Sequence, residues 1–85
     1  MTEQLKNAFI NIGLACEAAE TSVKNIAKTT VYIVNWDVSM MQSLIEAREA
    51  VKDRYDFKDT AMTLINVGGL FIPEMLVEIE AIAAK

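Results

Sequence analysis

The sequence predicts a single α+β domain in which two amphipathic helices cover one face of a three-stranded sheet. Two stretches, about 2–19 and 39–54, repeat apolar residues every three or four positions, as amphipathic helices do. Three further stretches, about 27–35, 61–67 and 75–83, are rich in β-branched residues or alternate between apolar and polar residues, as strands do. A chain of 85 residues with one proline leaves room for one domain.

The first predicted helix and strand both carry apolar residues where a core would need them. The apolar stripe of the helix consists of Leu5, Phe9, Ile12, Cys16 and Ala19. Cys16 is expected to be a small buried hydrophobe and not a nucleophile. The two faces of the strand carry Thr29, Val31 and Ile33 on one side and Thr30, Tyr32 and Val34 on the other. Both faces are mostly apolar, so both are expected to be covered.

The second predicted helix has two possible N-caps and one charged residue on its inner side. Ser39 and Gln42 fit an S-x-x-Q capping box, and Asp37 is a rival cap. The inner stripe is expected to consist of Met41, Leu44, Ile45, Arg48, Val51 and Tyr55. Arg48 is the misfit, but its alkyl stem can lie on the core while its guanidinium reaches solvent.

The last two predicted strands are joined by a connection that is too long for a tight hairpin. It contains Gly68 and Gly69, and later Pro73, which cannot donate to a strand ladder. The closing strand alternates, with Val77, Ile79, Ala81 and Ala83 on one face and Leu76, Glu78, Glu80 and Ile82 on the other. Glu78 and Glu80 are ordinary solvated residues if their face meets water. They are functional candidates if that face is buried.

The second face of the predicted sheet is too apolar to be left in water. It is expected to carry Thr30, Tyr32, Val34, Met62, Leu64, Leu76, Glu78 and Ile82. Hydrophobic residues make up 53% of the chain, and one cysteine and no histidine leave it without a disulfide or a common zinc site. The sequence therefore predicts a homo-oligomer in which another subunit supplies the second layer.

The composition argues against several classes of partner. A net charge of −4 and the lack of a Lys/Arg cluster argue against nucleic-acid binding. The absence of histidine argues against a metal site, and nothing in the sequence requires a cofactor. No stretch reaches the roughly 18 apolar residues of a membrane span, and the N-terminus does not look like a signal peptide. We therefore expect a cytoplasmic protein that binds neither nucleic acid nor membrane.

Four segments resemble the YjgF/Rid family, also called the L-PSP or enamine/imine deaminase family. They are "TEQLKNAFINIGLACEAAETS" (2–22), "NIAKTTVYIVNWD" (25–37), "TAMTLINVGGL" (60–70) and "IPEMLVEIEAIA" (72–83). The resemblance covers essentially all of residues 1–85. It implies a chorismate-mutase-like two-layer fold of order α-β-α-β-β, with two helices on one face of a mainly antiparallel sheet. It also implies a homotrimer, with ligand clefts between subunits, that hydrolyses imines such as 2-iminopropanoate to ketoacids and ammonia.

The resemblance also points to candidate site residues. Glu78 matches the family's cleft glutamate, which is thought to position or activate the attacking water, whereas Glu80 is expected at an interface or rim. Met62 stands where family deaminases usually carry an arginine that clamps the substrate carboxylate, and a thioether cannot do this. Met62, Leu64 and Tyr32 are expected to line the cleft or to pack the core. The chain begins at the first helix, where family members normally have a β-hairpin, so it looks like a short variant.

Three functions remain open at this point. The first is a Rid-like protein that binds a small molecule in a cleft between subunits, with altered or absent deaminase activity. The second is a true enamine/imine deaminase that uses another cation, such as Lys28 or Arg48. The third is a non-enzymatic oligomerisation module. The endoribonuclease activity attributed to some relatives is disfavoured by the acidic charge and by the absence of histidine, the usual acid or base in RNA cleavage.

Overall fold

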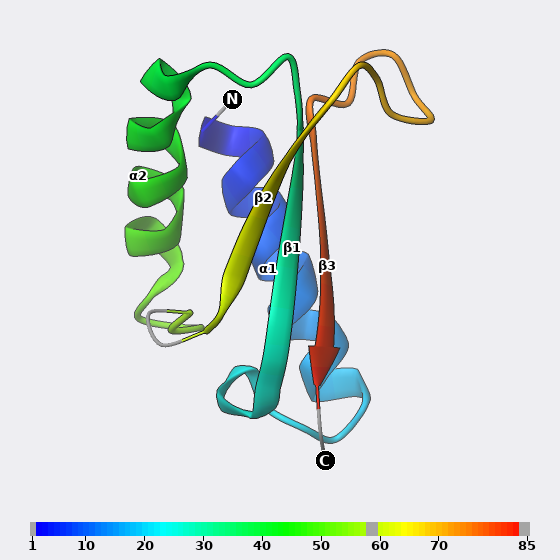
Figure 1. Ribbon diagram of the computed structural model, residues 1–85. Coiled ribbons are helices and arrows are strands. Elements are labelled where there is room, and N and C mark those ends of the chain that lie inside the picture. Colours follow the sequence, from blue (N-terminus) through cyan, green and yellow to red (C-terminus); the bar gives the residue numbers. More distant parts are fainter. Residues whose placement is uncertain (1, 58–59, 84–85) are drawn as a thin grey trace.

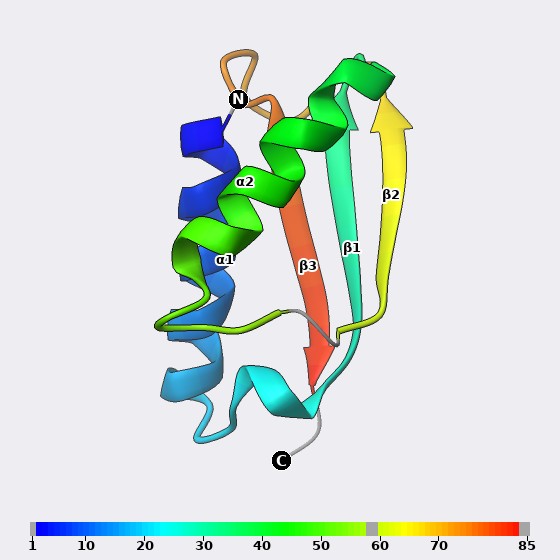
Figure 2. The same ribbon diagram turned by 90° about the vertical axis from the view of Figure 1, so that its left-hand side faces the viewer.

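Two helices lie on one face of a three-stranded sheet in the computed structural model, which describes residues 2–57 and 60–83 (Figure 1 and Figure 2). The elements, in chain order, are α1 (Thr2–Ala18), the short 3-10 helix η1 (Val23–Asn25), β1 (Ile26–Val34), the 3-10 helix η2 (Val38–Met40), α2 (Met41–Val51), β2 (Met62–Val67) and β3 (Val77–Ala83). The predicted two-layer α+β fold and its α-β-α-β-β order are confirmed, with small shifts at the ends of the elements.

The sheet is mixed, which corrects the expectation of a mainly antiparallel one. β1 lies in the centre and pairs in parallel with β2 and antiparallel with β3, so that the strand order is β2-β1-β3. The chain runs from β1 to β2 through α2, and a parallel pair needs a crossover of this kind. After β2 the chain reverses through residues 68–76, which brings β3 to the other edge of β1 (Figure 1).

The core lies between the sheet and the helices. Thr29, Val31 and Ile33 of β1 are completely buried there. The helices contribute Leu5, Phe9, Cys16, Leu44, Ala47 and Val51 to the same core. The rings of Phe9 and Phe57 meet with their centroids 4.9 Å apart and their planes tilted by 46°. The thiol of Cys16 is unpaired and buried in this cluster, as expected for a small hydrophobe.

The helix α2 turns a narrower face to the core than the sequence predicts, and Leu44, Val51 and Tyr55 of the predicted stripe are buried as expected. Leu44, Ala47 and Val51 are buried, whereas the predicted inner residues Met41 and Ile45 remain 42% and 41% exposed. The buried residues of α2 are thus spaced by three and four positions and form one narrow helical face. Ala47, at the centre of this face, is small and completely buried. The apolar residues alone suggested a wider stripe because they extend around the helix beyond the part that meets α1 and the sheet.

Gly13 allows the ring of Tyr55 to pack directly against the backbone of α1. A Cβ atom at position 13 would lie 2.4 Å from the Cδ2 and Cε2 atoms of Tyr55, far inside the usual contact distance of carbon atoms. Tyr55 is only 4% exposed. A glycine inside a helix costs about 1 kcal/mol relative to alanine, and this ring contact gives the glycine a structural reason.

Asp37, and not the predicted capping box of Ser39 and Gln42, caps the segment that leads into α2. The carboxylate of Asp37 accepts a hydrogen bond from the backbone N–H of Ser39 at 3.2 Å and another from the Ser39 hydroxyl. These contacts cap η2, and α2 then starts directly after it without a side-chain cap of its own. Ser39 is therefore already inside a helical turn, where it cannot act as the N-cap of α2.

Replacing Asp37 with asparagine should remove a pH-dependent contribution to stability. The hydrogen bonds donated by the Ser39 hydroxyl and backbone N–H hold the pKa of Asp37 below its usual value of 3.8. A carboxyl pKa lowered by folding stabilises the protein above the unfolded-state pKa, and the contribution is lost as the pH falls through the folded-state pKa. Melting temperatures of wild type and Asp37→Asn should differ near about pH 7 and converge below about pH 3. A constant difference over that range would contradict this role of the carboxylate.

The side chain of Gln4 connects the first turn of α1 to the chain just before β3. Its amide nitrogen Nε2 donates to the backbone carbonyl of Glu74 at 3.2 Å. Its amide oxygen Oε1 accepts from the backbone N–H of Leu76 at 2.8 Å. The 68–76 connection is thus held at its base, while Phe71 within it is 99% exposed.

Candidate functional site

The side of the sheet that faces away from the helices is uncovered in the single chain (Figure 1 and Figure 2). Residues paired across neighbouring strands point to the same side, so the strand registers decide which side chains lie there. We call this side the open face, and it carries Lys28, Thr30, Tyr32, Val34, Thr63, Ile65, Val67, Glu78, Glu80 and Ile82. The predicted alternation of the closing strand is confirmed, because Val77 and Ile79 pair with the buried residues Ile33 and Val31 of the opposite side.

Met62 and Leu64 do not lie on the open face, and the prediction that they share a face with Tyr32 and Glu78 is wrong. Met62 pairs with Thr29 and Leu64 with Val31, so both point to the helix side, where they pack against the core. The phase of β2 relative to β1 is set by the parallel register, and a shift of one residue exchanges the two faces. Neither residue can therefore line a site on the open face.

Tyr32 and two glutamates form the polar centre of the open face. Glu78 lies directly opposite Tyr32 across the antiparallel pair, and Glu80 lies opposite Thr30. The hydroxyl of Tyr32 donates a hydrogen bond to Oε1 of Glu80 at 3.0 Å. This hydrogen bond is the main reason why the pKa of Tyr32 is raised, followed by desolvation and by the negative charges of Glu80 and Glu78. The phenol is therefore a hydrogen-bond donor at neutral pH, held by one of the two carboxylates.

Glu78 is the unengaged carboxylate of this group. Within residues 2–57 and 60–83 its side chain makes no hydrogen bond and no ion pair. Glu80, in contrast, is held by Tyr32. The two glutamates that look equivalent in the sequence thus differ in the structure, and Glu78 is the one with oxygens available to water or a ligand.

The charge of the open face is acidic. Its two carboxylates face a single ammonium group, that of Lys28, which lies near one end of β1 and pairs with Ile82. Arg48 belongs to α2 on the other side of the sheet, and the guanidinium carbon of Arg54 lies 5.0 Å from the centre of the Tyr55 ring in the helix layer. In the described part of the chain, no arginine lies on the same face as Glu78.

The sequence did not reveal two of the residues around this centre. Thr63 pairs with Thr30 and Ile65 with Tyr32, in the places that Met62 and Leu64 were expected to take. A difference in polarity between the two faces of β2 could have shown which face meets the helices. Both faces of β2 carry apolar residues, however, so its sequence is compatible with either orientation.

The described residues offer no metal site and no membrane-spanning helix. No group of three or more cysteine, aspartate or glutamate side chains among them is placed to hold a metal ion. None of the helices in that part of the chain is both long and apolar enough to cross a bilayer.

The chain closely resembles larger solved proteins in three dimensions. A Rid-family protein of unknown function, YyfB from Yersinia pestis, matches with a TM-score of 0.85 and 24% identity over 100% of this chain and 62% of that protein. TdcF from E. coli, solved with bound serine, matches with a TM-score of 0.82 and 26% identity over 99% of this chain and 64% of that protein. The chain thus spans less than two thirds of the length of these relatives.

Sequence and structure together establish the family. A search of curated proteins found no match. The YjgF protein of E. coli matches with a TM-score of 0.81 and 27% identity over 99% of this chain and 64% of that protein. A sequence model of the family described as "Endoribonuclease L-PSP" matches residues 1–85, the whole chain. The chain is therefore a member of the L-PSP family, and its fold is that of the YjgF/Rid proteins.

Proposed function

We propose that this chain binds a small organic molecule in clefts between copies of itself, with the open face as one wall of each cleft. The observation that carries the proposal is the pairing of an unengaged carboxylate, Glu78, with the Tyr32–Glu80 hydrogen bond on an uncovered sheet face that also carries exposed apolar residues. Polar groups that converge within apolar surroundings are typical of small-molecule sites. The TdcF structure with bound serine supports a small ligand for a protein of this fold.

The apolar part of the open face supports self-association. Ile65 is 40% exposed and lies one pair along from the half-buried Val34 and Val67. Ile82 is 65% exposed and lies at the other end of the sheet, opposite Lys28. Exposed and half-exposed apolar side chains grouped on an uncovered sheet face, as Ile65, Val34 and Val67 are, favour an interface. The family resemblance implies a trimer, so a homotrimer is the assembly that we propose.

Glu78 is the residue to which we assign the chemical role, if the bound molecule is an imine. Hydrolysis adds water to the carbon of the C=N bond, and a base must take the proton of that water. Glu78 can accept this proton and pass it to the nitrogen. The hydroxyl of the adduct then loses its proton to the nitrogen through the same carboxylate, so that ammonia leaves and the carbonyl forms. A carboxylate with free oxygens within reach of the bound water is suited to this task.

The charges of the open face argue for a substrate other than a small imino acid. An imino acid carries a carboxylate, which Glu78 and Glu80 would repel in the absence of a nearby arginine. Lys28 or an arginine of a neighbouring copy would have to compensate. RNA is disfavoured for the same electrostatic reason, since a chain with a net charge of −4 lacks the positive surface that binds phosphates.

Glu78→Gln should abolish imine hydrolysis while leaving the fold intact. The rate of ammonia release is measured with an uncharged imine and with 2-iminopropanoate, and loss of a general base should lower kcat/KM by about 100- to 10,000-fold. Glu74→Gln is the matched control, because Glu74 is an exposed glutamate outside the open face and should leave the rate unchanged.

Three outcomes would contradict this function or the role of Glu78 in it. If wild-type protein shows neither saturable binding nor hydrolysis of either imine, the chain is better described as an oligomerisation module. If 2-iminopropanoate is hydrolysed well and Lys28→Ala raises its KM strongly, the chain is an ordinary imino-acid deaminase with a recruited cation. Equal activity of Glu78→Gln and wild type would remove Glu78 from the mechanism.

A further inference from the structure

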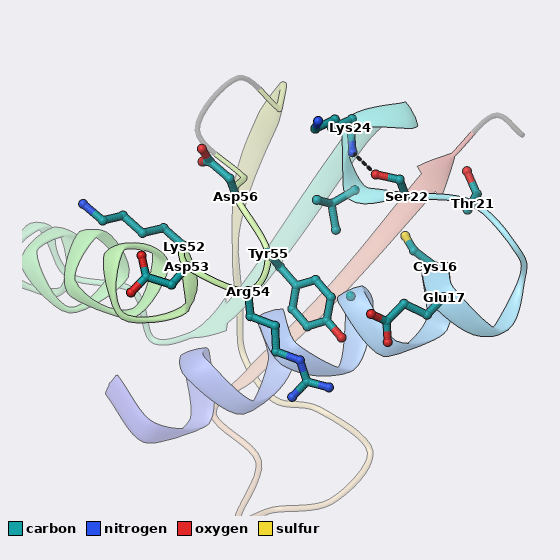
Figure 3. A pocket seen from close by; sticks show the side chains of 12 residues that line it. Cys16, Glu17, Thr21, Ser22, Lys24, Lys52, Asp53, Arg54, Tyr55 and Asp56 are labelled. Carbon is teal, nitrogen blue, oxygen red and sulfur yellow. Dashed lines mark hydrogen bonds between the residues drawn. The ribbon is translucent and has the colours of Figure 1, made fainter.

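The pocket between the C-terminal part of α1 and residues 52–56 selects no particular partner. Charged side chains of both signs surround it, and the ring of Tyr55 occupies the space beside α1 (Figure 3). The two edges of the sheet, in contrast, differ clearly from each other, because the strand at one edge carries charges and the strand at the other carries none.

The edge formed by β3 is protected against association with other strands. β1 lies in the centre of the sheet, so β2 and β3 are its outer strands, and in the described part of the chain no further strand pairs with either. β3 carries Glu78 and Glu80, and its pairing with β1 contains a register shift between Ile26 and Lys28. Charged side chains and irregular pairing are devices by which natural edge strands avoid the addition of another strand.

The edge formed by β2 has none of these protections. Residues 60–73 contain no charged side chain, although charged residues make up 24% of the chain, and the single proline, Pro73, lies beyond the strand. All six residues of β2 pair with β1 without a register shift. A regular, uncharged strand at the edge of a sheet is the typical site at which another strand adds.

The outer side of β2 presents the backbone groups of Met62, Leu64 and Asn66. The carbonyl oxygens of Ala61 and Val67 accept backbone hydrogen bonds from β1 and from the residue that follows it, at 2.9 and 3.0 Å. Because alternate residues of a strand direct their N–H and C=O groups to opposite edges, the odd-numbered residues of β2 face β1 and the even-numbered ones face away from it. Figure 2 shows β2 as the outermost strand of the sheet on this side.

We propose that the β2 strands of two copies of this chain pair antiparallel, edge to edge, about a two-fold axis at Leu64. In this register Leu64 faces Leu64 of the second copy, and Met62 faces Asn66. Each facing pair exchanges two backbone hydrogen bonds, which gives about six bonds in all. The flanking residues out to Thr60 and Gly68 would also face each other, and none of them is charged, so no like charges meet.

A second copy fits this edge because the pairing is self-complementary. On the open face, Ile65 of each copy would lie opposite Thr63 of the other, and β-branched side chains pack well across antiparallel strands. The pairing joins two three-stranded sheets into one continuous sheet and extends the open face without covering it. The β2 pairing is therefore independent of the function proposed for the open face.

Amide hydrogen exchange of the full chain, followed by NMR, tests this pairing. The outward amides of Met62, Leu64 and Asn66 should exchange freely in dilute protein and at least about tenfold more slowly in concentrated protein, where copies pair. The amides of Thr63 and Ile65 donate to β1 and should be protected at every concentration, which shows that β2 itself stays formed.

The outward amides of β3 are the control edge. The carbonyl oxygen of Leu76 accepts from the backbone N–H of Val34 at 2.9 Å, so the amides of Ile79 and Ala81 point to the outer side of the sheet. They should stay exchangeable at all concentrations. Assembly through the open face alone buries side chains and leaves the outward amides of β2 exchangeable, which keeps this test apart from the test of the proposed function.

Leu64→Pro should separate the pair and halve the mass measured by light scattering. Proline removes the outward N–H of residue 64 and no hydrogen bond to β1, and it is tolerated at such a position of an edge strand. Leu64→Ala is the matched control, because it loses the same side chain but keeps the N–H, and it should pair as wild type does. A lysine in an edge strand is itself a protection, so Ile65→Lys should also break the pair.

Three results would overturn the pairing. One is free exchange of the outward amides of β2 at all concentrations up to about 1 mM, since a weaker association would be negligible. Another is equal mass and equal protection in Leu64→Pro and Leu64→Ala. The third is protection that appears at Ile79 and Ala81 instead, because β3 would then be the edge that associates. If Leu64→Pro fails to fold, Met62→Pro at the start of β2, with Met62→Ala beside it, gives the same comparison.

Discussion

Gly13→Ala should destabilise the protein by about 1–3 kcal/mol, the range of an overpacked core. The sign is opposite to that of the same change in an ordinary helix, where alanine is favoured over glycine by about 1 kcal/mol. The reason is the Tyr55 ring, whose Cδ2 and Cε2 atoms lie 2.4 Å from the position that the new methyl group would take. The ring is buried and cannot turn away freely, so α1 or the segment after α2 must shift. Urea unfolding measures the effect.

A double-mutant cycle shows whether the clash is with this ring. Tyr55→Leu removes the flat ring, and in that background Gly13→Ala should cost much less or become stabilising, with a coupling energy of about 1–3 kcal/mol. Asn11→Ala on the exposed side of α1 is the matched control and should change stability by no more than about 0.5 kcal/mol. An equal cost of Gly13→Ala in both backgrounds would show that the contact does not explain the glycine.

Ile65→Lys should convert the proposed homo-oligomer into a monomer. Ile65 lies opposite Tyr32 on the open face, so a subunit that covers this face would bury the new ammonium group. Desolvating an ammonium group in an interface costs far more than leaving it exposed, and the carboxylate nearest in the same row, Glu78, lies on β3 beyond Tyr32, with none on β2 itself. Size exclusion with light scattering gives the mass of wild type and variant directly.

Ile45→Lys is the control for this experiment. Ile45 is 41% exposed on α2 and Ile65 is 40% exposed on β2, so both substitutions place the same charge at an equally exposed isoleucine. Only the change on the open face should alter the mass. If both variants keep the wild-type mass, the open face is not the interface. A wild-type monomer would show that no second copy covers this face under the conditions measured.

The elements of this fold were predictable because their signals are local. Helical spacing in α1 and alternation in β3 are each contained in one short segment, and both were read correctly. The assignment of Glu78 and Glu80 to one face of the closing strand followed from the same alternation. Apolar residues on both sides of β1 also led to the prediction of a second layer from another subunit, which stays a prediction because the structure is that of a single chain.

Features that depend on how distant segments meet were not predictable. The prediction for Met62 and Leu64 chose the wrong face because the register between β2 and β1 decides which residues of β2 face the helices. The sequence of β2 alone does not indicate this register. The contact between Gly13 and Tyr55 was missed for a similar reason, although a glycine inside an apolar helical stripe is a signal for close approach. The hydrogen bond from Tyr32 to Glu80, which leaves Glu78 unengaged, needs side-chain positions that no pattern contains.

The two hydrogen bonds of Gln4 have a consequence for the order in which this chain folds. They join residues that are 70 and 72 positions apart, so they close a loop that contains almost the whole sequence. Closing a long loop is entropically costly, and contacts of high sequence separation form late. The elements β1, α2 and β2 follow one another along the chain, so the contacts among them close shorter loops and can form earlier. We therefore expect the first turn of α1 and the start of β3 to dock together late in folding and to separate early in unfolding.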